Sequence, residues 1–417
     1  MPDISTLNGV DVGDVASMNG SDAGDCASVN GQVWPNLAGT LWVWGDGRTG
    51  NMGIGAGANN DVSSPIQVGT DTDWSISSLN TDGSNVLCIK TDGTIWSWGG
   101  GAHGRHGLAA ITSDYNVSSP IQMGTSTNWT AAGAGSNAQG IIGGGKLYTF
   151  GYNAAGALGH NLGLYLANGN RVAARGTQSS PTQVGTDTNW SKITGGTHSF
   201  IALKTDGTLW GWGSNQNGTS GINVAGNNGA RSSPVQVGTA TNWTQISAHA
   251  ESSGAINADG ELYMWGRGGY TGNGQGDNVD RSVPIQVGTD TDWAALSINY
   301  GNALALKTDG SIYIWGLGRY GQLGNNTTGN TAHVSSPIQV GTTTNNASIF
   351  MGRSFAKVRK TDGTMFSWGK NTKGELGRGD EVNRSTPTQM GTDANWGQAS
   401  AGVGFSSGGG NNAEIKT

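Results

Sequence analysis

Charge, histidine and cysteine are scarce in this chain, and each shortage argues against a class of function. Charged residues make up 12% of the 417 residues, about half the usual share, and the net charge is −6. Lys and Arg form no run, so the basic stripe needed to bind nucleic acid is missing and no nucleic-acid partner is expected. His103 and His106 lie in an HGRH segment without a third ligand, whereas a zinc site needs at least three, so we interpret the segment as a surface loop.

Long apolar runs are also missing. No stretch approaches the 18 consecutive apolar residues of a membrane span, so no membrane insertion is expected. The N-terminus has no basic segment followed by an apolar one, which predicts that there is no secretory signal peptide. Cys26 and Cys88 are the only cysteines; they form no CxxC pattern, and we expect no disulfide between them.

Aromatic residues, in contrast, recur with a long period. Seven short β-patterned runs end in an aromatic residue followed by Gly, and the aromatic positions are Trp44, Trp98, Phe150, Trp212, Trp265, Trp315 and Trp368. A period of about 50 residues is typical of a propeller or solenoid, in which no single unit can bury its own apolar face.

Three further landmarks accompany each aromatic-Gly pair. Asp-Gly precedes the run in most units, as at Asp206-Gly207, and predicts a tight hairpin turn; Gly143-Gly144-Gly145 replaces it in the third unit. Seven of the nine prolines fall in SSPIQVG-like segments, where Pro suits the free edge of a strand. A Trp follows in TDTDW-like segments, but the sixth of the seven positions holds Asn346, where we expect a packing gap or a local rearrangement.

The two termini look like halves of one hairpin. The chain ends in Ile415-Lys416-Thr417, which matches the segment before an Asp-Gly turn in other units, and Gly39–Trp42 matches the segment after it. We therefore predict an all-β, seven-bladed β-propeller of four-stranded antiparallel blades, closed by pairing of the N- and C-terminal strands. The expected division is an arm, residues 1–36, and a ring, residues 37–417.

These motifs resemble the RCC1 (regulator of chromosome condensation) repeat family. Its DG-x-aromatic-x-WG strand recurs throughout residues 37–417, and its GQLG loop is present as Gly321–Gly324 and in modified form as Gly374–Gly377. The resemblance implies the propeller fold. It implies no single activity, because the family includes a nucleotide exchange factor, a plant ultraviolet photoreceptor and a bacterial β-lactamase inhibitor protein.

The first 36 residues carry a shorter repeat, of period 11. Asn-Gly pairs between alternating segments suggest strands of four or five residues joined by turns, at Asn8-Gly9, Asn19-Gly20 and Asn30-Gly31. The arm is therefore either a flexible leader or a segment that becomes ordered by adding strands to a partner's sheet. It is similar to repeats in structural proteins of tailed phages, cyanophages especially, which implies attachment to other virion proteins.

Catalytic and metal-binding groups do not converge in this sequence. His198, in GGTHSF, reads as a hydrogen-bonded core residue rather than a general base. Acidic pairs such as Asp71 with Asp73 and Asp290 with Asp292 lack the Gly and distal Glu of a calcium loop, so we expect them to cap their own backbone. We predict no catalytic residues, no metal and no cofactor, and hence a protein that is not an enzyme.

Binding residues are expected in the variable loops between each aromatic-Gly pair and the next Pro. All seven loops should emerge on one side of the ring, and loops on a rigid scaffold commonly carry binding sites. Their aromatic and Arg side chains either contact a partner or pack their own loops. The candidates are Tyr115, Tyr152, Tyr165, Arg171, Arg175, Arg267, Tyr270, Arg319 and Tyr320.

The leading hypothesis is a non-enzymatic phage virion protein, assembled in the host cytoplasm. The arm would dock on other virion proteins, and the propeller would decorate the capsid or tail or bind a host surface glycan or protein through its loops. The alternative is a bacterial protein–protein interaction module resembling the β-lactamase inhibitor protein.

Overall fold

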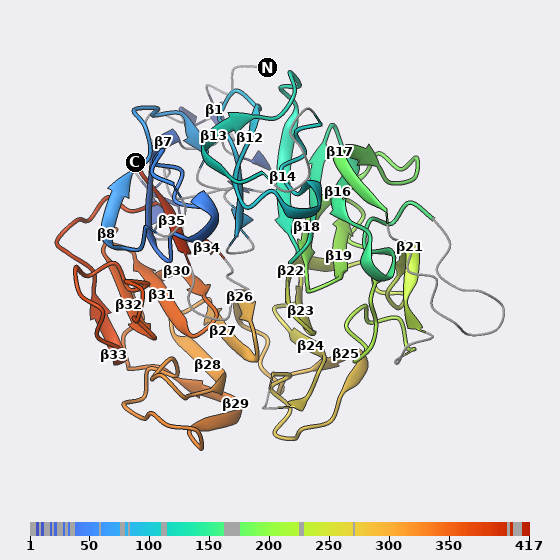
Figure 1. The fold of residues 1–417 in the computed structure, drawn as a ribbon. Coiled ribbons are helices and arrows are strands. Elements are labelled where there is room, and N and C mark those ends of the chain that lie inside the picture. Colours follow the sequence, from blue (N-terminus) through green and yellow to red (C-terminus); the bar gives the residue numbers. More distant parts are fainter. Residues whose placement is uncertain are drawn as a thin grey trace.

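Seven β-sheets surround a central axis as the blades of a propeller (Figure 1). The computed structural model describes residues 38–57, 60–75, 80–81, 84–109, 115–161, 176–224, 229–269, 272–397, 401–402 and 411–417, with six two-residue strands before them. We number the blades by their aromatic-Gly pairs and name the strands a to d from the axis outward. The a strands of neighbouring blades contact one another, which places them innermost.

Blades 3 to 7 are regular. Each contains four antiparallel strands in chain order. They are β14 (Trp129–Ala134), β15 (Ala138–Gly143), β16 (Lys146–Tyr152) and β17 (Thr177–Gln183); β18 (Trp190–Gly195), β19 (Ser199–Lys204), β20 (Leu209–Gly213) and β21 (Arg231–Gln236); β22 (Trp243–His249), β23 (Ser252–Asn257), β24 (Leu262–Gly266) and β25 (Arg281–Gln286); β26 (Trp293–Asn299), β27 (Asn302–Lys307), β28 (Ile312–Leu317) and β29 (His333–Gln339); and β30 (Asn346–Met351), β31 (Phe355–Lys360), β32 (Met365–Gly369) and β33 (Arg384–Gln389). Among the described residues the helical elements η3, η4 and η5 are single 3-10 turns, at Arg48–Gly50, Ala102–Gly104 and Ala154–Gly156.

Blade 1 joins the two ends of the chain, as predicted. Its strands are β35 (Asn411–Lys416), β7 (Ala38–Gly45) and β8 (Val62–Gln67). The antiparallel register sets Ile415 opposite Leu41. Trp396, in the d–a segment of this blade, forms a bridge with Lys416.

Blade 2 contains four antiparallel strands and one additional short strand from the C-terminal part of the chain. Its own strands are β10 (Asn80–Thr81), β11 (Asn85–Ile89), β12 (Ile95–Gly99) and β13 (Val117–Gln122), and β34 (Ala401–Gly402) pairs with β10 in parallel. The short strand β9 (Trp74–Ser75) pairs with the start of β7. The two blades are thus linked near the axis as well as by blade packing.

The aromatic of each aromatic-Gly pair is fully buried between blades. Most of these indoles donate a hydrogen bond to a carbonyl in the loop of the preceding blade, for example Trp212 Nε1 to Ala157 O at 2.9 Å and Trp368 Nε1 to Gln322 O at 2.9 Å. The Asp-Gly turns also form as predicted. Gly207 has φ +75°, and a Cβ there would lie 2.1 Å from Thr241 O, so Gly is required for both conformation and space. The repeated motif is therefore a packing motif.

At Asn346 the predicted rearrangement is found. Its side chain is buried and donates hydrogen bonds to Gly310 O at 2.7 Å and Thr343 O at 3.0 Å. It also accepts one from Lys360 Nζ at 2.6 Å. A polar network has replaced the indole ring that other blades place here.

A buried ion pair crosses the interface where the ring closes. Lys357 of β31 contacts Glu414 of β35, and both side chains are fully buried. The Lys357 ammonium also lies 4.9 Å from the ring centroids of Trp44 and Phe350. The C-terminal strand is therefore held both by its hydrogen-bond ladder and by a buried charge.

The arm contains three small antiparallel pairs: β1 (Thr6–Leu7) with β2 (Val10–Asp11), β3 (Ser17–Met18) with β4 (Ser21–Asp22), and β5 (Ser28–Val29) with β6 (Gln32–Val33). These strands have two residues each, so the predicted length of four or five residues is wrong. Asn8, Gly9, Asn19, Gly20, Asn30 and Gly31 lie outside the described residues, as does Cys26.

Candidate functional site

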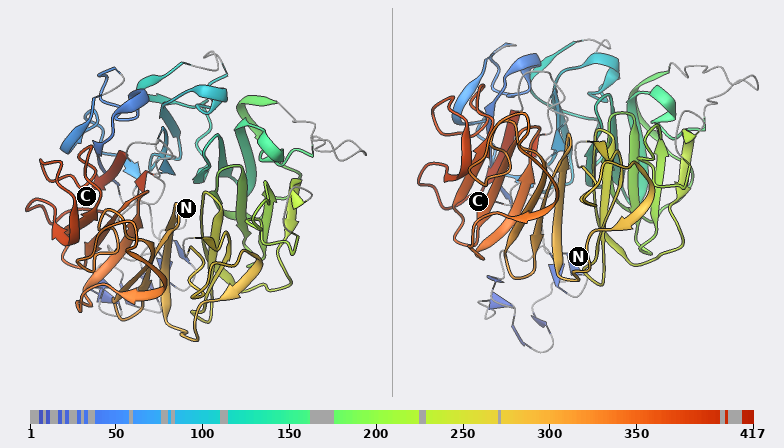
Figure 2. Two further views of the ribbon diagram at one scale, coloured as in Figure 1. Left: turned by 60° about the horizontal axis from the view of Figure 1, so that its bottom comes forward. Right: turned by 90° about the horizontal axis from the view of Figure 1, so that it is seen from below.

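The strand order gives the ring two unlike faces. The c–d loops and the a–b turns emerge on one face, which we call the loop face; the Asp-Gly b–c turns and the d–a segments lie on the other, the turn face (Figure 2). The arm enters β7, a c strand, at Ala38 and therefore joins the ring on the turn face. The loop face and the point where the arm attaches lie at opposite ends of the blades.

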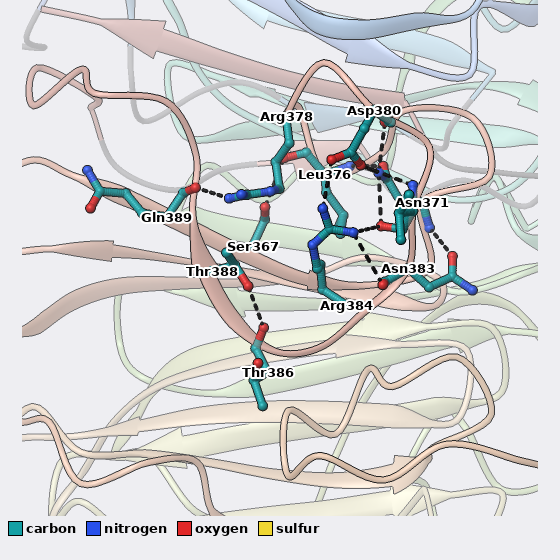
Figure 3. Close-up of polar contacts among 11 residues, drawn as sticks. Ser367, Asn371, Leu376, Arg378, Asp380, Asn383, Arg384, Thr386, Thr388 and Gln389 are labelled. Atoms are coloured by element: carbon teal, nitrogen blue, oxygen red, sulfur yellow. Dashed lines mark hydrogen bonds and ion pairs between the residues drawn. The ribbon is translucent and has the colours of Figure 1, made fainter.

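The c–d loops are held by a recurrent Asn three residues after the aromatic. In blade 7 the Asn371 side chain accepts from Leu376 N at 2.8 Å and donates to Asp380 O at 2.8 Å (Figure 3). Arg384 then holds Asp380 through a 2.7 Å ion pair. Asn153 and Asn215 accept equivalent backbone bonds in blades 3 and 4, so the same Asn contact holds the first residues of these loops.

Each loop also reaches the next blade. Among the described residues of blades 1 and 3 to 7, a loop backbone N–H donates to the carbonyl of the Ser two residues before the Pro of the neighbouring d strand, as Asn223 N does to Ser282 O at 2.8 Å and Asn326 N to Ser385 O at 2.9 Å. The loops thus tie blades together while presenting their tips outward.

One aromatic cluster on the loop face spans blades 2, 3 and 4. His103 stacks on Tyr152 with centroids 4.6 Å apart, and Tyr152 meets His198 edge-on at 6.4 Å. His103 is exposed, and the other two are half-buried. The prediction that His198 is a core residue was wrong. His198 lies in the a–b turn of blade 4, after β18 has ended at Gly195, and not within a strand. Burial lowers the pKa of His198.

A second cluster lies over blades 5, 6 and 7. The Arg353 guanidinium covers the Tyr300 ring at 4.6 Å, and Tyr300, exposed, has the unusual φ of +34°. Tyr300 N donates to His249 Nδ1 at 3.0 Å beneath it. Burial, with a smaller contribution from Arg353, lowers the pKa of His249 to about 3, so its imidazole is neutral at pH 7.

The structure brings some of the predicted candidates together. Tyr152 joins the first cluster; Arg319 lies over Tyr320 at 5.2 Å, and Lys370 of the next blade lies 6.0 Å from the same ring. Arg267 is held by Glu251 at 2.7 Å. Tyr115 stands apart and is 68% exposed.

Four candidates, Tyr165, Arg171, Arg175 and Tyr270, lie outside the described residues. The binding candidates predicted from the sequence did not include His103, His198, Tyr300 or Arg353. Three of them occupy a–b turns, which were not considered as binding positions, and the HGRH segment was interpreted only as a loop.

His106 differs from its neighbour His103. It is buried, and its Nδ1 lies 3.0 Å from Asn85 Nδ2 while its Nε2 lies 3.0 Å from Tyr115 O. Burial is the main cause of its lowered pKa. The interpretation of HGRH as a plain surface loop therefore holds for His103 only, because His106 is buried and its ring contacts Asn85 and the backbone of Tyr115.

The turn face carries a repeated lysine clamp. In blade 6, Lys307 Nζ pairs with Asp290 at 2.8 Å and Asp292 at 3.0 Å and lies over Trp293 and Tyr313. Equivalent clamps are built on Lys90, Lys204 and Lys416. The expectation that these aspartates cap their own backbone was wrong, because the b-strand lysine reaches them. The Asp-Gly aspartates do cap, as Asp206 does by accepting from Thr208 N at 3.0 Å.

Within the described part of the chain, no three His, Cys, Asp or Glu side chains gather as metal ligands would. The same residues contain no helix long and apolar enough to cross a membrane.

Comparison with known families agrees with this geometry. The family model of the regulator of chromosome condensation (RCC1) repeat matches residues 206–256, 309–356 and 362–407, and a second RCC1 repeat model matches 190–219 and 293–322. The chain therefore contains RCC1 repeats, which these models match over residues 190–256, 293–356 and 362–407. The matched segments start at or near Asp-Gly turns or d–a segments and cover blades 4, 6 and 7 most fully, with the first two strands of blade 5.

Among curated proteins, the mitochondrial RCC1 domain-containing protein RUG3 of Arabidopsis thaliana is 27% identical over 56% of this chain and 51% of its own length. The E3 ubiquitin-protein ligase HERC2 of Homo sapiens is 25% identical over 56% of this chain and 5% of its own. The chain thus spans about half of RUG3 and a small part of HERC2.

Among solved structures, Prp20p of Saccharomyces cerevisiae superposes with a TM-score of 0.75 at 19% identity, covering 91% of this chain and 92% of Prp20p. Human WBSCR16 gives a TM-score of 0.73 at 18% identity, covering 91% of this chain and all of that one. These similarities establish the RCC1-type propeller as the fold of this chain.

Proposed function

We propose that this RCC1-repeat protein acts by binding, without catalysis, as a structural component of a phage particle. The arm of residues 1–36 attaches the ring to other virion proteins. The loop face then points away from the particle and contacts a protein or glycan on the host surface.

The observation that carries this proposal is that the arm and the side-chain clusters lie on opposite faces of the ring. The arm enters at Ala38 on the turn face, while the aromatic and cationic clusters around Tyr152 and Tyr300 lie on the loop face. A scaffold fixed at one face presents the other, and Tyr and Arg side chains are those most enriched at binding hot spots. The period-11 arm, which is similar to phage structural repeats, supports attachment to a particle.

The absence of catalysis is part of the proposal, and several titratable groups of the ring are in structural use. Lys357 and Glu414 hold the closing interface, His249 accepts a backbone N–H, and the turn-face lysines sit in clamps.

Mass spectrometry of purified particles tests the virion role. We expect peptides of this chain in wild-type particles and their loss when residues 1–36 are deleted, while the deleted ring keeps the wild-type circular dichroism spectrum. Absence of the full-length chain from particles would falsify the virion role.

A second candidate is an interaction module that needs no particle. It is favoured by the RCC1 neighbours, since yeast RCC1 (Prp20) was solved bound to Kap60 and Prp20p was studied for binding to Gsp1p and histones. Deletion of residues 1–36 separates the two functions, because an interaction module keeps its affinity for a soluble partner without the arm.

A further inference from the structure

The blades differ at one position of the turn face. The last residue of strand b is Lys in blades 1, 2, 4, 6 and 7, but blade 5 has Asn257 there and blade 3 has Gly143. The aspartate that pairs with the lysine changes in parallel: Asp290 in blade 6 corresponds to Ala240 in blade 5. Blade 5 has therefore lost both charged partners of the clamp.

Blade 5 nevertheless keeps the two aromatic rings that contact the lysine in the clamp. Trp243 and Tyr263 meet edge-on with centroids 5.1 Å apart and planes at 84°. In blade 6 the matching Trp293 and Tyr313 are 5.3 Å apart at 79°, and the Lys307 ammonium lies within 5.1 Å of both rings. The same two ring faces that bind an ammonium in blade 6 are thus present in blade 5 beside a neutral Asn.

Blade 5 has also gained a carboxylate. Glu261 stands where blades 1, 2, 4, 6 and 7 have Thr or Ser, and it accepts from Asn257 Nδ2 at 2.7 Å and Tyr263 Oη at 2.9 Å. Both donors are neutral, so they leave the negative charge of Glu261 in place. Burial and the neighbouring Glu261 raise the pKa of the Tyr263 hydroxyl, as expected beside such a charge.

An open cavity of about 820 Å³ leads to this position. Trp243, Tyr263, Glu261 and Asn257 line it together with Ile222 and Pro284, which add apolar wall. It offers a carboxylate and two aromatic faces for a cation, and apolar contacts for an attached methylene chain.

We propose that the cavity of blade 5 binds the side chain of a lysine supplied by a protein partner, with its ammonium between Trp243, Tyr263 and Glu261. The chain's own lysines adopt this arrangement in four other blades, which makes a lysine side chain the occupant of matching shape and charge. Blade 3 is the internal control: its Trp129–Tyr148 pair is similar, at 5.3 Å and 81°, but Lys146 takes the place of Glu261 and repels a cation. The inference does not depend on the virion role or on the loop face.

The test is a titration of the full chain, labelled with ¹⁵N at its 16 Trp indoles, with Nα-acetyl-lysine-N-methylamide. Trp243→Phe assigns the resonance of Trp243. We expect a saturable shift of that resonance with a Kd of about 1–10 mM and no comparable shift of Trp129. Nα-acetyl-norleucine-N-methylamide, which lacks the ammonium, should give no saturable shift.

Two variants test the assignment of the site. Glu261→Thr, which introduces the residue of blades 1, 2, 4 and 7, should weaken binding at least tenfold. Asn257→Lys should abolish binding, because the ammonium of the new lysine side chain would occupy the space between Trp243, Tyr263 and Glu261. The remaining indole resonances report whether each variant is folded. An unchanged Kd in both variants, an equal response to norleucine, or no saturable shift would overturn the proposal. Binding of n-butylammonium tenfold tighter than the lysine amide would also overturn it, in favour of a free amine.

Discussion

The turn face and the loop face of this ring are built from the same repeats but differ in how much they vary. On the turn face, Lys90, Lys204, Lys307 and Lys416 repeat one clamp of aspartate and aromatic rings. On the loop face each blade places something different, such as His103 against Tyr152 or Arg353 over Tyr300. Side chains are repeated where they hold blades together and differ where they face outward, which is the pattern expected when a uniform scaffold carries a specific binding surface.

Truncation of the strand that closes the ring should lower the free energy of unfolding more than any of the substitutions below. Removing residues 413–417 takes away most of β35 and leaves the edge of β7 unpaired. It also removes Glu414, so the buried Lys357 ammonium loses this carboxylate. We expect a loss of several kcal/mol, about 4 or more, or aggregation through the exposed edge. Urea unfolding followed by circular dichroism measures it; an unchanged midpoint would show that the terminal pairing is dispensable.

The buried pair tests the same interface with a single side chain. Glu414→Ala leaves the Lys357 ammonium buried without its partner and should cost about 3–5 kcal/mol. The double variant Lys357→Met with Glu414→Leu should recover most of this loss, because it removes the buried charge. Both are measured by urea unfolding, and a double variant as unstable as the single one would contradict this account.

Acid should destabilise the base of the second loop-face cluster. The folded-state pKa of His249 is about 3, below the unfolded value of about 6.5, so the unfolded chain binds the proton first as pH falls. The stability contributed by neutral His249 is complete above pH 6.5 and declines between pH 6.5 and 3, by about 3 kcal/mol down to pH 4. His249→Asn keeps an acceptor for Tyr300 N and should show a shallower fall of Tm over this range; parallel curves would contradict the assignment.

A single clamp should contribute less than the closing interface. Lys307→Met should cost about 1–2 kcal/mol, since the ammonium loses two partly exposed carboxylates and two ring faces. The loss should shrink in high salt. Lys146→Met in blade 3, an exposed lysine, is the matched control and should change stability by less than about 0.5 kcal/mol.

Loop-face substitutions should separate binding from stability. Tyr152→Ala removes the ring between His103 and His198 and should change the free energy of unfolding by less than about 1 kcal/mol. If the loop face binds a partner through this cluster, affinity should fall by about fivefold or more, measured on intact particles against host cells. A large loss of stability with unchanged affinity would assign Tyr152 to packing its own loop.

The sequence predicted those features that repetition makes visible. The seven blades, the Asp-Gly turns and the pairing of Ile415 opposite Leu41 follow from motifs that recur at fixed spacing. The clamps were missed although Lys and Asp occur together in blades 1, 2, 4 and 6, because the two lie on segments about 17 residues apart and neither is informative alone. The pair of Lys357 and Glu414 occurs once, across 57 residues, and no pattern marks it.

The split of blade 1 also sets a time order for synthesis. Strand β7 emerges among the first residues, but its partner β35 follows about 370 residues later. At ribosomal rates that interval is roughly 20–75 s, during which one side of β7 has no native strand to pair with. The ring can therefore close only after β35 has left the ribosome, and a chaperone that covers β7 during that interval would raise the yield of closed rings.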